Sequence, residues 1–277
     1  MKSLMSCFGL GIFFLLCWCV MGGADASEQE RTLKIVLGKK VYRVSTQTMR
    51  KQLKVQTLTH PSGVYYKKRM TYLYVRLPQV LKLVGIDFSK VASMRFHCRD
   101  GFIGRWNPQN PKDLLLALRE KGNPKLFTDV AEGKETVNPG PFFVMTPDPK
   151  TRKQWDWPHQ VFQITVSYQR TKTLSFPVGA KVGTAVHKGY QLFSSVCLAC
   201  HTVNLDGGQI GPEFNIPKNI TEYRSRTYLR TFIQHPTSYR AKSRMPSFSY
   251  LNSEQLDQIL AYLTHMKKHK RFDKLRK

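Results

Sequence analysis

Cys197-Leu198-Ala199-Cys200-His201 is the segment whose residue types and spacing point most directly to chemistry. Two cysteines separated by two residues and followed by histidine form the C-x-x-C-H pattern of covalent haem attachment. Both thiols can reach the vinyl groups of one porphyrin, and the next residue can aim a neutral imidazole at the iron. The motif predicts one covalent haem on Cys197 and Cys200, with His201 as the proximal ligand.

A zinc half-site and a redox cysteine pair are the alternative interpretations of this motif. A structural zinc site needs four ligands, and the sequence has no second Cys/His pair to complete it. A redox C-x-x-C pair usually begins a helix after a strand. The residues before Cys197 have a helical pattern instead, which favours haem attachment.

The motif lies in a C-terminal segment whose apolar residues have helical periodicity. Val182, Val186, Tyr190 and Phe193 predict a first helix beside Gly189. A second helix is predicted around Tyr228 to Ile233, ending before His235-Pro236. The last helix should begin after Asn252 as N-cap, with Gln255 completing a capping box and Leu251 and Leu256 forming a hydrophobic staple. The apolar face predicted for this last helix consists of Leu256, Ile259, Leu260 and Leu263.

Residues 181–267 resemble the class I cytochrome c family. The resemblance rests on CLACH, Gly211-Pro212 and Arg244-Met245-Pro246, and on Gly189, Phe193 and Tyr262. It implies that the first and last helices cross at Gly189, Phe193 and Tyr262, and that Pro212 lies near the proximal histidine. It also implies that Met245 is the distal iron ligand.

Two axial ligands leave no open iron position, so the chemistry implied is outer-sphere electron transfer, and a thioether ligand raises the potential. Met266, His235 and His187 are other distal candidates. Met266 fits the surface or core of the last helix, His235 a helix end, and His187 a solvent-facing position.

Residues 27–175 have a different composition, which is rich in β-branched and aromatic residues and is interrupted by turn residues. This pattern predicts an α+β domain with a mixed sheet, joined to an all-α cytochrome c domain by a linker at 176–180. The predicted strands are residues 32–37, 40–44, 92–97, 142–145 and 159–168, with a turn at Asp100-Gly101. Residues 78–84 and 111–120 each begin with proline and are predicted as short helices.

The order of FHCRDGF (96–102), GPFF (140–143) and WPHQV (157–161) resembles the molybdopterin-binding domain of sulfite-oxidase-like oxidoreductases. The resemblance covers about residues 32–170. In that family a cysteine before the D-G-aromatic turn binds molybdenum, but residues 54–69 contain no cysteine. We therefore expect no molybdenum cofactor, and a scaffold that serves docking or sensing. Cys98 is expected to be a small buried hydrophobe.

His97, His159, Trp155 and Trp157 could line a residual pocket in this domain. The simpler interpretation is that the tryptophans cover the sheet and the histidines lie at its edge. We favour this structural role for all four residues.

Residues 1–26 have the layout of a secretory signal, with Lys2, an apolar run over 8–21 and Ala24-Asp25-Ala26 before Ser27. The apolar run is shorter than a spanning helix needs, although an uncleaved N-terminal anchor stays an alternative. The sequence therefore predicts a periplasmic protein. Cleavage leaves Cys98, Cys197 and Cys200, which do not form a disulfide framework.

The chain of 277 residues carries a net charge of +26, and the basic segment 268–277 ends it. An exported haem protein without a nucleic-acid-binding motif is not expected to bind nucleic acid. The charge instead favours an acidic redox protein or an anionic membrane surface as partner.

Two functions follow. The first is a periplasmic electron carrier with one haem c, which is the favoured hypothesis over an enzyme. The second is a fused molybdenum oxidoreductase, sulfite-dehydrogenase-like, that passes electrons to its own haem.

Overall fold

The computed structural model describes residues 30–60, 69–132, 135–153, 155, 157–169 and 173–274. The signal predicted at 1–26 lies outside these residues. No helix in the described part of the chain combines the length and apolar character needed to cross a membrane.

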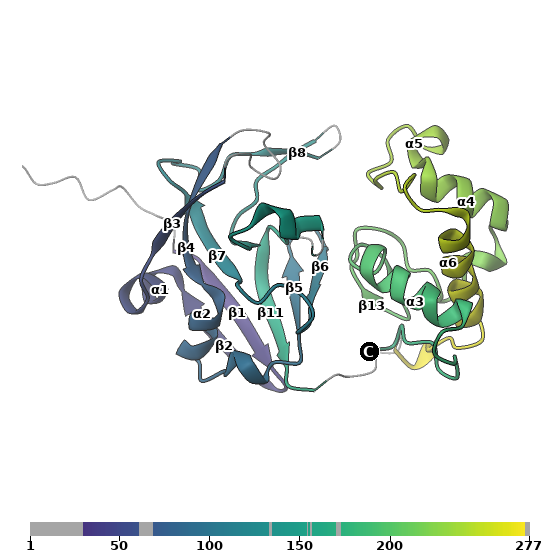
Figure 1. Cartoon of the computed structure of the whole chain (residues 1–277), viewed down its shortest axis with the longest axis horizontal. Coiled ribbons are helices and arrows are strands. Elements are labelled where there is room, and N and C mark those ends of the chain that lie inside the picture. The colour runs from purple at the N-terminus through teal and green to yellow at the C-terminus, as the bar shows by residue number, and fades with distance from the viewer. Residues whose placement is uncertain are drawn as a thin grey trace, which may run out of the picture. The chain divides into compact units, whose positions relative to one another are not determined.

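The N-terminal segment is built on two β-sheets (Figure 1). The five-stranded sheet has the order β2 (Lys40–Ser45), β1 (Thr32–Leu37), β11 (Val161–Ser167), β5 (Ser93–Cys98) and β6 (Ile103–Trp106). The β1–β11 pair is parallel and the other pairs are antiparallel, which confirms the predicted mixed sheet.

The second sheet has four antiparallel strands. Its order is β10 (Phe143–Met145), β7 (Leu115–Glu120), β4 (Met70–Arg76) and β3 (Gln56–His60). A two-stranded ribbon, β8 (Val130–Glu132) and β9 (Glu135–Val137), lies between β7 and β10 in the chain. Buried side chains from both large sheets form one hydrophobic core, in which Ile35 and Leu116 are fully buried.

Short helices connect the strands. Ser45 caps α1 (Thr46–Gln52) by accepting from the Thr48 N–H. Helix α2 (Leu77–Leu83) has proline in its first turn and confirms the helix predicted at 78–84. Single-turn helices η1 (Phe88–Lys90) and η2 (Pro149–Lys153) complete this part.

The helix predicted over 111–120 is wrong, because β7 forms there. Leucine, alanine, arginine and glutamate favour helices, but β7 is an inner strand between β4 and β10. The residues from Leu114 to Leu118 are all fully buried, which is the pattern of a strand covered on both faces. Tertiary burial therefore overrides the local helix propensity.

The C-terminal segment is helical, as predicted, and has a separate hydrophobic core. Its helices are α3 (Ala185–Val196), α4 (Arg226–Gln234), α5 (Pro236–Tyr239) and α6 (Ser253–Met266), with η3 (Ile220–Glu222) and η4 (Phe272–Lys274) as single turns. The short pair β12 (Thr202–Val203) and β13 (Asp206–Gly207) follows α3. Val182 was predicted in the first helix but lies before its N-cap, Thr184, and is 84% exposed.

Helix α6 confirms the predicted cap. Asn252 accepts from the Gln255 N–H and the Gln255 side chain accepts from the Asn252 N–H. Leu256, Ile259, Leu260 and Leu263 are all buried. The amphipathic pattern and the capping box together fix where α6 begins and which face it buries.

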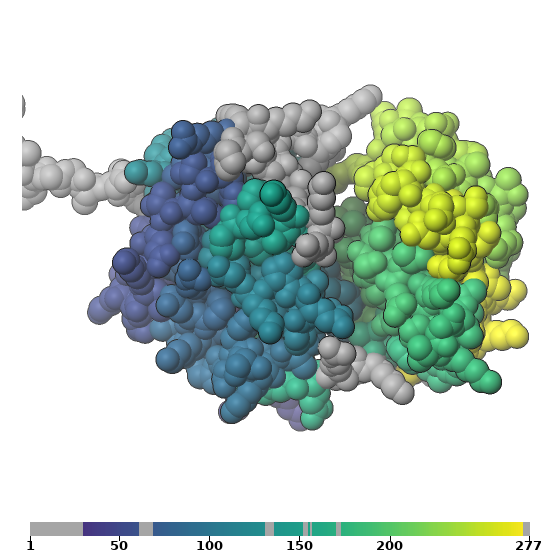
Figure 2. All heavy atoms as spheres, in the orientation of Figure 1, coloured from purple at the N-terminus to yellow at the C-terminus, as the bar shows by residue number. Residues whose placement is uncertain are grey.

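Helices α3 and α6 cross at Gly189 (Figure 1). A Cβ at Gly189 would collide with the backbone carbonyl of Gln258 and come within 3.0 Å of the Tyr262 Cβ. The Phe193 and Tyr262 rings lie 5.1 Å apart, centroid to centroid, beside this contact. The crossing therefore depends on a residue without a side chain. The space-filling view shows the green and yellow atoms of this segment as one closely packed surface (Figure 2).

Gly189→Val should lower the free energy of unfolding of the helical segment by about 3 kcal/mol, because the added side chain meets backbone that cannot yield without separating the helices. The measurement is urea unfolding of the haem-loaded protein, followed by haem absorbance. Gln191→Val, at an exposed position of the same helix, is the control and should change the value by less than about 0.5 kcal/mol. Equal effects of the two changes would contradict the crossing.

Candidate haem-binding site

The C-x-x-C-H residues form one helical turn at the end of α3. The Cys197 N–H donates to the Phe193 carbonyl at 2.8 Å, so Cys197 still belongs to the helix. The N–H groups of Cys200 and His201 then donate to the Cys197 carbonyl at 3.1 and 2.9 Å. This turn brings both thiols and the imidazole, predicted from sequence as the haem site, to one place.

A glycine-rich segment packs against the turn. The Gly208 N–H donates to the Leu198 carbonyl at 2.9 Å, and the Gly211 N–H donates to the Cys200 carbonyl at 2.8 Å. A Cβ on Gly208 would overlap the Ala199 carbonyl, and one on Gly211 would overlap the His201 ring. The backbone can approach the motif this closely only because both residues lack side chains.

His201 is held in one orientation. Its Nδ1 lies 3.0 Å from the Pro212 carbonyl oxygen, which can only accept, so Nδ1 carries the proton. Burial lowers the pKa of His201, although the bond to Pro212 raises it in part. The neutral ring therefore has its lone pair on Nε2, which is the form that binds haem iron.

The cysteine environment also suits haem. Cys197 and Cys200 are not in a disulfide. Burial, with Cys200 nearby, raises the pKa of Cys197 to about 12. A sulfur that resists ionisation is compatible with an uncharged thioether and unfavourable for a zinc thiolate. The residues present therefore fit a covalent haem, with Cys197 and Cys200 as attachment points and His201 as proximal ligand.

Met245 lies in the loop between α5 and α6 and is half-buried. The loop is attached to the end of α4: the Phe248 N–H donates to the Ile233 carbonyl at 3.2 Å, and the Ser247 hydroxyl donates to the Gln234 carbonyl at 2.6 Å. The Met245 N–H donates to the Ser243 hydroxyl. An anchored loop can hold a ligand side chain at a fixed position, and the distal role of Met245 stays a prediction.

The other sulfur and imidazole candidates occupy structural positions. Met266 is 1% exposed and belongs to the hydrophobic core of the helical segment. His235 is exposed and ends α4 as its C-cap. His187 is half-buried on α3, where it was expected to face solvent.

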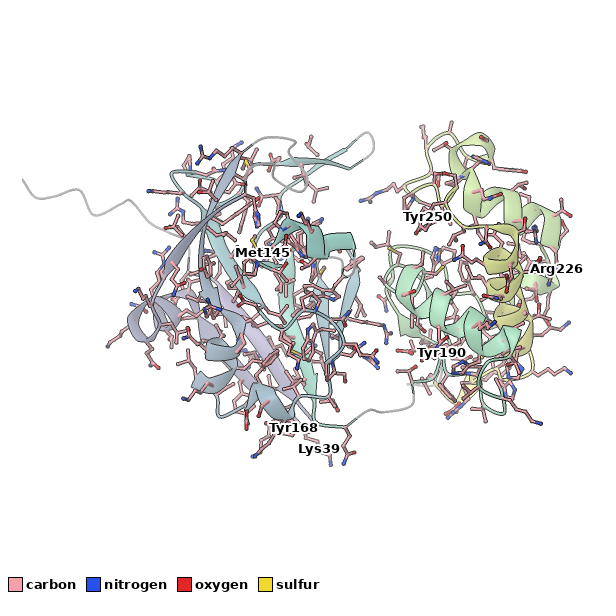
Figure 3. All side chains as sticks on the ribbon, in the orientation of Figure 1. Lys39, Met145, Tyr168, Tyr190, Arg226 and Tyr250 are labelled. Carbon is pink, nitrogen blue, oxygen red and sulfur yellow. The ribbon has the colours of Figure 1, made fainter. Side chains whose placement is uncertain are left out.

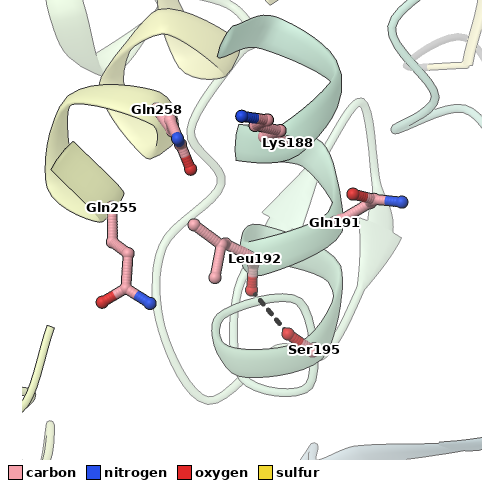
Figure 4. A pocket seen from close by; sticks show the side chains of 6 residues that line it. All are labelled: Lys188, Gln191, Leu192, Ser195, Gln255 and Gln258. Carbon is pink, nitrogen blue, oxygen red and sulfur yellow. Dashed lines mark hydrogen bonds between the residues drawn. The ribbon is translucent and has the colours of Figure 1, made fainter. Parts of the chain in front are cut away.

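A shallow pocket lies between α3 and α6 (Figure 4). Leu192 is an apolar residue of its lining, and the Ser195 hydroxyl donates to the Leu192 carbonyl at 3.0 Å. The other lining side chains are polar: Lys188, Gln191, Gln255 and Gln258. No residue of the C-x-x-C-H motif lines this pocket, so it is distinct from the haem-binding turn.

In the sheet segment, the residues singled out for a residual pocket have structural positions. Trp155 and Trp157 are buried in the core, and the Trp155 indole N–H donates to the Arg105 carbonyl. His97 Nε2 lies 3.0 Å from the Thr165 hydroxyl, and His159 is 8% exposed. The described residues contain no group of three or more His, Cys, Asp or Glu side chains placed to hold a metal ion.

Cys98 is confirmed as a buried hydrophobe. It is 4% exposed at the end of β5 and belongs to the core. Burial, together with the nearby Asp100, raises the pKa of its thiol far above the ordinary range. Asp100 does not pair with Arg99 in the structure but accepts from the Phe102 N–H, which closes the predicted turn.

A helical segment whose first helix ends in C-x-x-C-H and crosses its last helix fits a protein that binds haem covalently. Residues 186–267 match the family model for cytochrome c. This match supports a cytochrome c domain at these residues, and with it a haem-binding electron carrier in which haem c is covalently attached. The match does not extend to the sheet segment, and a search of curated proteins found no match to the chain.

Sequence reasoning missed three residues next to the site. The Phe214 ring stacks on the His201 ring, with centroids 4.2 Å apart. Asp206 is buried beside the glycine-rich segment, where Ser175 donates to its carboxylate at 2.6 Å. The signal for Phe214 was an aromatic residue two positions after Pro212, but no local pattern marks Asp206 or Ser175.

The colour of the loaded protein should stay with the polypeptide during acid-acetone extraction, because both thioether bonds survive it. Cys197→Ser/Cys200→Ser should carry no covalent haem. Cys98→Ala is the matched control, since Cys98 is buried in the other core, and should keep it. Colour in the organic phase from the unchanged protein would contradict the attachment.

Met245→Ala should abolish the weak thioether-to-iron absorption of the oxidised protein and lower its reduction potential, because a thioether ligand favours ferrous iron. Met266→Leu conserves core volume and should leave both properties unchanged. An unchanged spectrum in Met245→Ala, with a changed one in Met266→Leu, would assign the distal ligand to Met266 instead.

Proposed function

We propose that this protein is an exported, periplasmic electron carrier with a single haem c. The observation that carries the proposal is the haem-binding turn, with His201 Nδ1 bonded to Pro212 and Nε2 left to ligate. The sequence contains one C-x-x-C-H motif, which supports one covalent haem. The signal-like residues 1–26 support export, and an uncleaved signal would make them a membrane anchor.

The basic groups near the loop of Met245 support an acidic redox partner. Arg226 and Arg230 both pair with Asp257, so their charge is partly compensated. Arg240, Lys242 and Arg244 are exposed on the loop after α5. Tyr250, which is 69% exposed, adds an aromatic side chain to the same loop (Figure 3). This loop surface, residues 240–250, is the proposed docking surface.

The C-terminal basic residues contribute less than their number suggests. Lys270 pairs with Glu222 at 2.7 Å, and Arg271 pairs with Asp273 at 3.0 Å. Lys267 and Lys268 are exposed. An anionic membrane surface is the second partner that this charge would suit, and nucleic acid is not proposed.

A fused molybdenum oxidoreductase is the second candidate function. The order of motifs that resembles sulfite-oxidase-like enzymes favours it, and the missing cysteine in residues 54–69 opposes it. The sheet segment is therefore proposed as a scaffold without this cofactor. Measuring molybdenum beside iron, in protein from a host that makes the cofactor, separates the two functions: stoichiometric molybdenum would establish the fused enzyme.

The rate of haem reduction by a reduced acidic flavodoxin should fall as salt rises, because opposite charges accelerate encounter and salt screens them within about 10 Å. Lys242→Glu/Arg244→Glu should flatten this dependence. The matched control is Lys39→Glu/Lys40→Glu, at the turn between β1 and β2 (Figure 3), which makes the same change in net charge.

The control variant should keep most of the salt dependence, since its charges lie in the sheet segment. A parent rate that is flat with ionic strength would contradict electrostatic docking. Binding to anionic vesicles would then be the next measurement.

A further inference from the structure

Arg95 and Arg105 lie directly opposite each other on β5 and β6. Like charges at such a cross-strand position repel and destabilise a sheet. Burial lowers the pKa of Arg95, and Arg105 lowers it further. An anion beside the two arginines would therefore relieve their repulsion.

Asp206 of β13 supplies that anion. Its carboxylate lies 3.0 Å from the Arg105 guanidinium and 3.6 Å from that of Arg95, and its side chain is 5% exposed. Burial alone would raise the pKa of Asp206, but Arg105, Ser175 and Arg95 outweigh burial and the pKa lies below its ordinary value. The carboxylate is thus ionised, and removing it would leave two half-buried like charges facing each other without a counter-ion.

Two backbone hydrogen bonds flank this ion-pair cluster. The Ile103 N–H of β6 donates to the Ala199 carbonyl at 2.9 Å, and the Gln209 N–H donates to the Gly101 carbonyl at 2.8 Å. Ala199 lies between the two haem-attachment cysteines. Gly101 has φ +90, and a Cβ there would lie 3.2 Å from the Gln209 carbonyl carbon. The β5–β6 hairpin therefore contacts the backbone of the haem-binding turn itself.

We infer that Asp206, Arg95 and Arg105 form a latch that fixes the sheet segment on the haem-binding turn, and that the sheet segment thereby closes this side of the haem to external redox proteins. The inference rests on the proposed electron-carrier function for its second part only. The exposed loop at residues 240–250 is then the side left for partners.

The latch is tested by amide hydrogen exchange. Each substitution is made in one segment, and exchange is measured at an amide of the other segment. Asp206→Asn should accelerate exchange at Ile103 at least tenfold, and Arg105→Gln should accelerate it at Gln209 by a smaller factor, because Arg95 still holds Asp206. Peptides containing the two amides are followed by mass spectrometry on the haem-loaded full chain.

Two control variants remove the same kinds of ion pair at other places in the chain. Asp257→Asn removes a carboxylate that also binds two arginines, but all three lie in the helical segment. Arg76→Gln breaks the pair with Asp113 within the sheet segment. Neither should alter exchange at Ile103 or Gln209. Arg105→Gln changes no residue of the cytochrome c domain, so it keeps the test valid if Asp206→Asn fails to fold.

The closing role is tested by reduction with flavodoxin, whose rate should rise several-fold in Asp206→Asn, rise by a smaller factor in Arg105→Gln, and stay constant in Arg76→Gln. Unchanged exchange at both amides would overturn the latch. Faster exchange with an unchanged reduction rate would overturn the closing role. If flavodoxin reduces no variant and no parent protein, the proposed function fails, while the exchange data still decide the latch.

Discussion

The close approach of α3 and α6 at Gly189 is the contact on which the helical segment depends. It places Phe193 and Tyr262 in one buried cluster, and α3 leaves this cluster directly into the haem-binding turn. The Tyr262 hydroxyl donates to the Ser175 carbonyl, and the Ser175 hydroxyl donates to Asp206. One helix crossing thus connects the core, the segment that precedes the cytochrome c domain, and the carboxylate bound to the sheet.

Local patterns predicted the parts of the structure that local interactions determine. The capping box at Asn252 and Gln255, the apolar face of α6 and the chemistry of CLACH are all short-range features, and each could be derived from spacing alone. The Pro212 contact of His201 followed from the family resemblance and is present in the structure.

Long-range features could not be derived in this way. Residues 115–120 are good helix formers, and only their place between β4 and β10 makes them a strand. The cross-strand pairing of Arg95 with Arg105 depends on the register of β5 and β6. Their counter-ion, Asp206, lies 101 positions after Arg105 in the chain. Sequence periodicity contains no information on such pairings.

The hydrogen bond from Ile103 to Ala199 also joins two segments of the chain that are synthesised at different times. The strands of the sheet segment precede CLACH in the chain and leave the ribosome first. The β6 edge can therefore be completed only after Ala199 has been synthesised, so the last backbone contact of this sheet edge depends on the residues that also carry the haem-attachment motif.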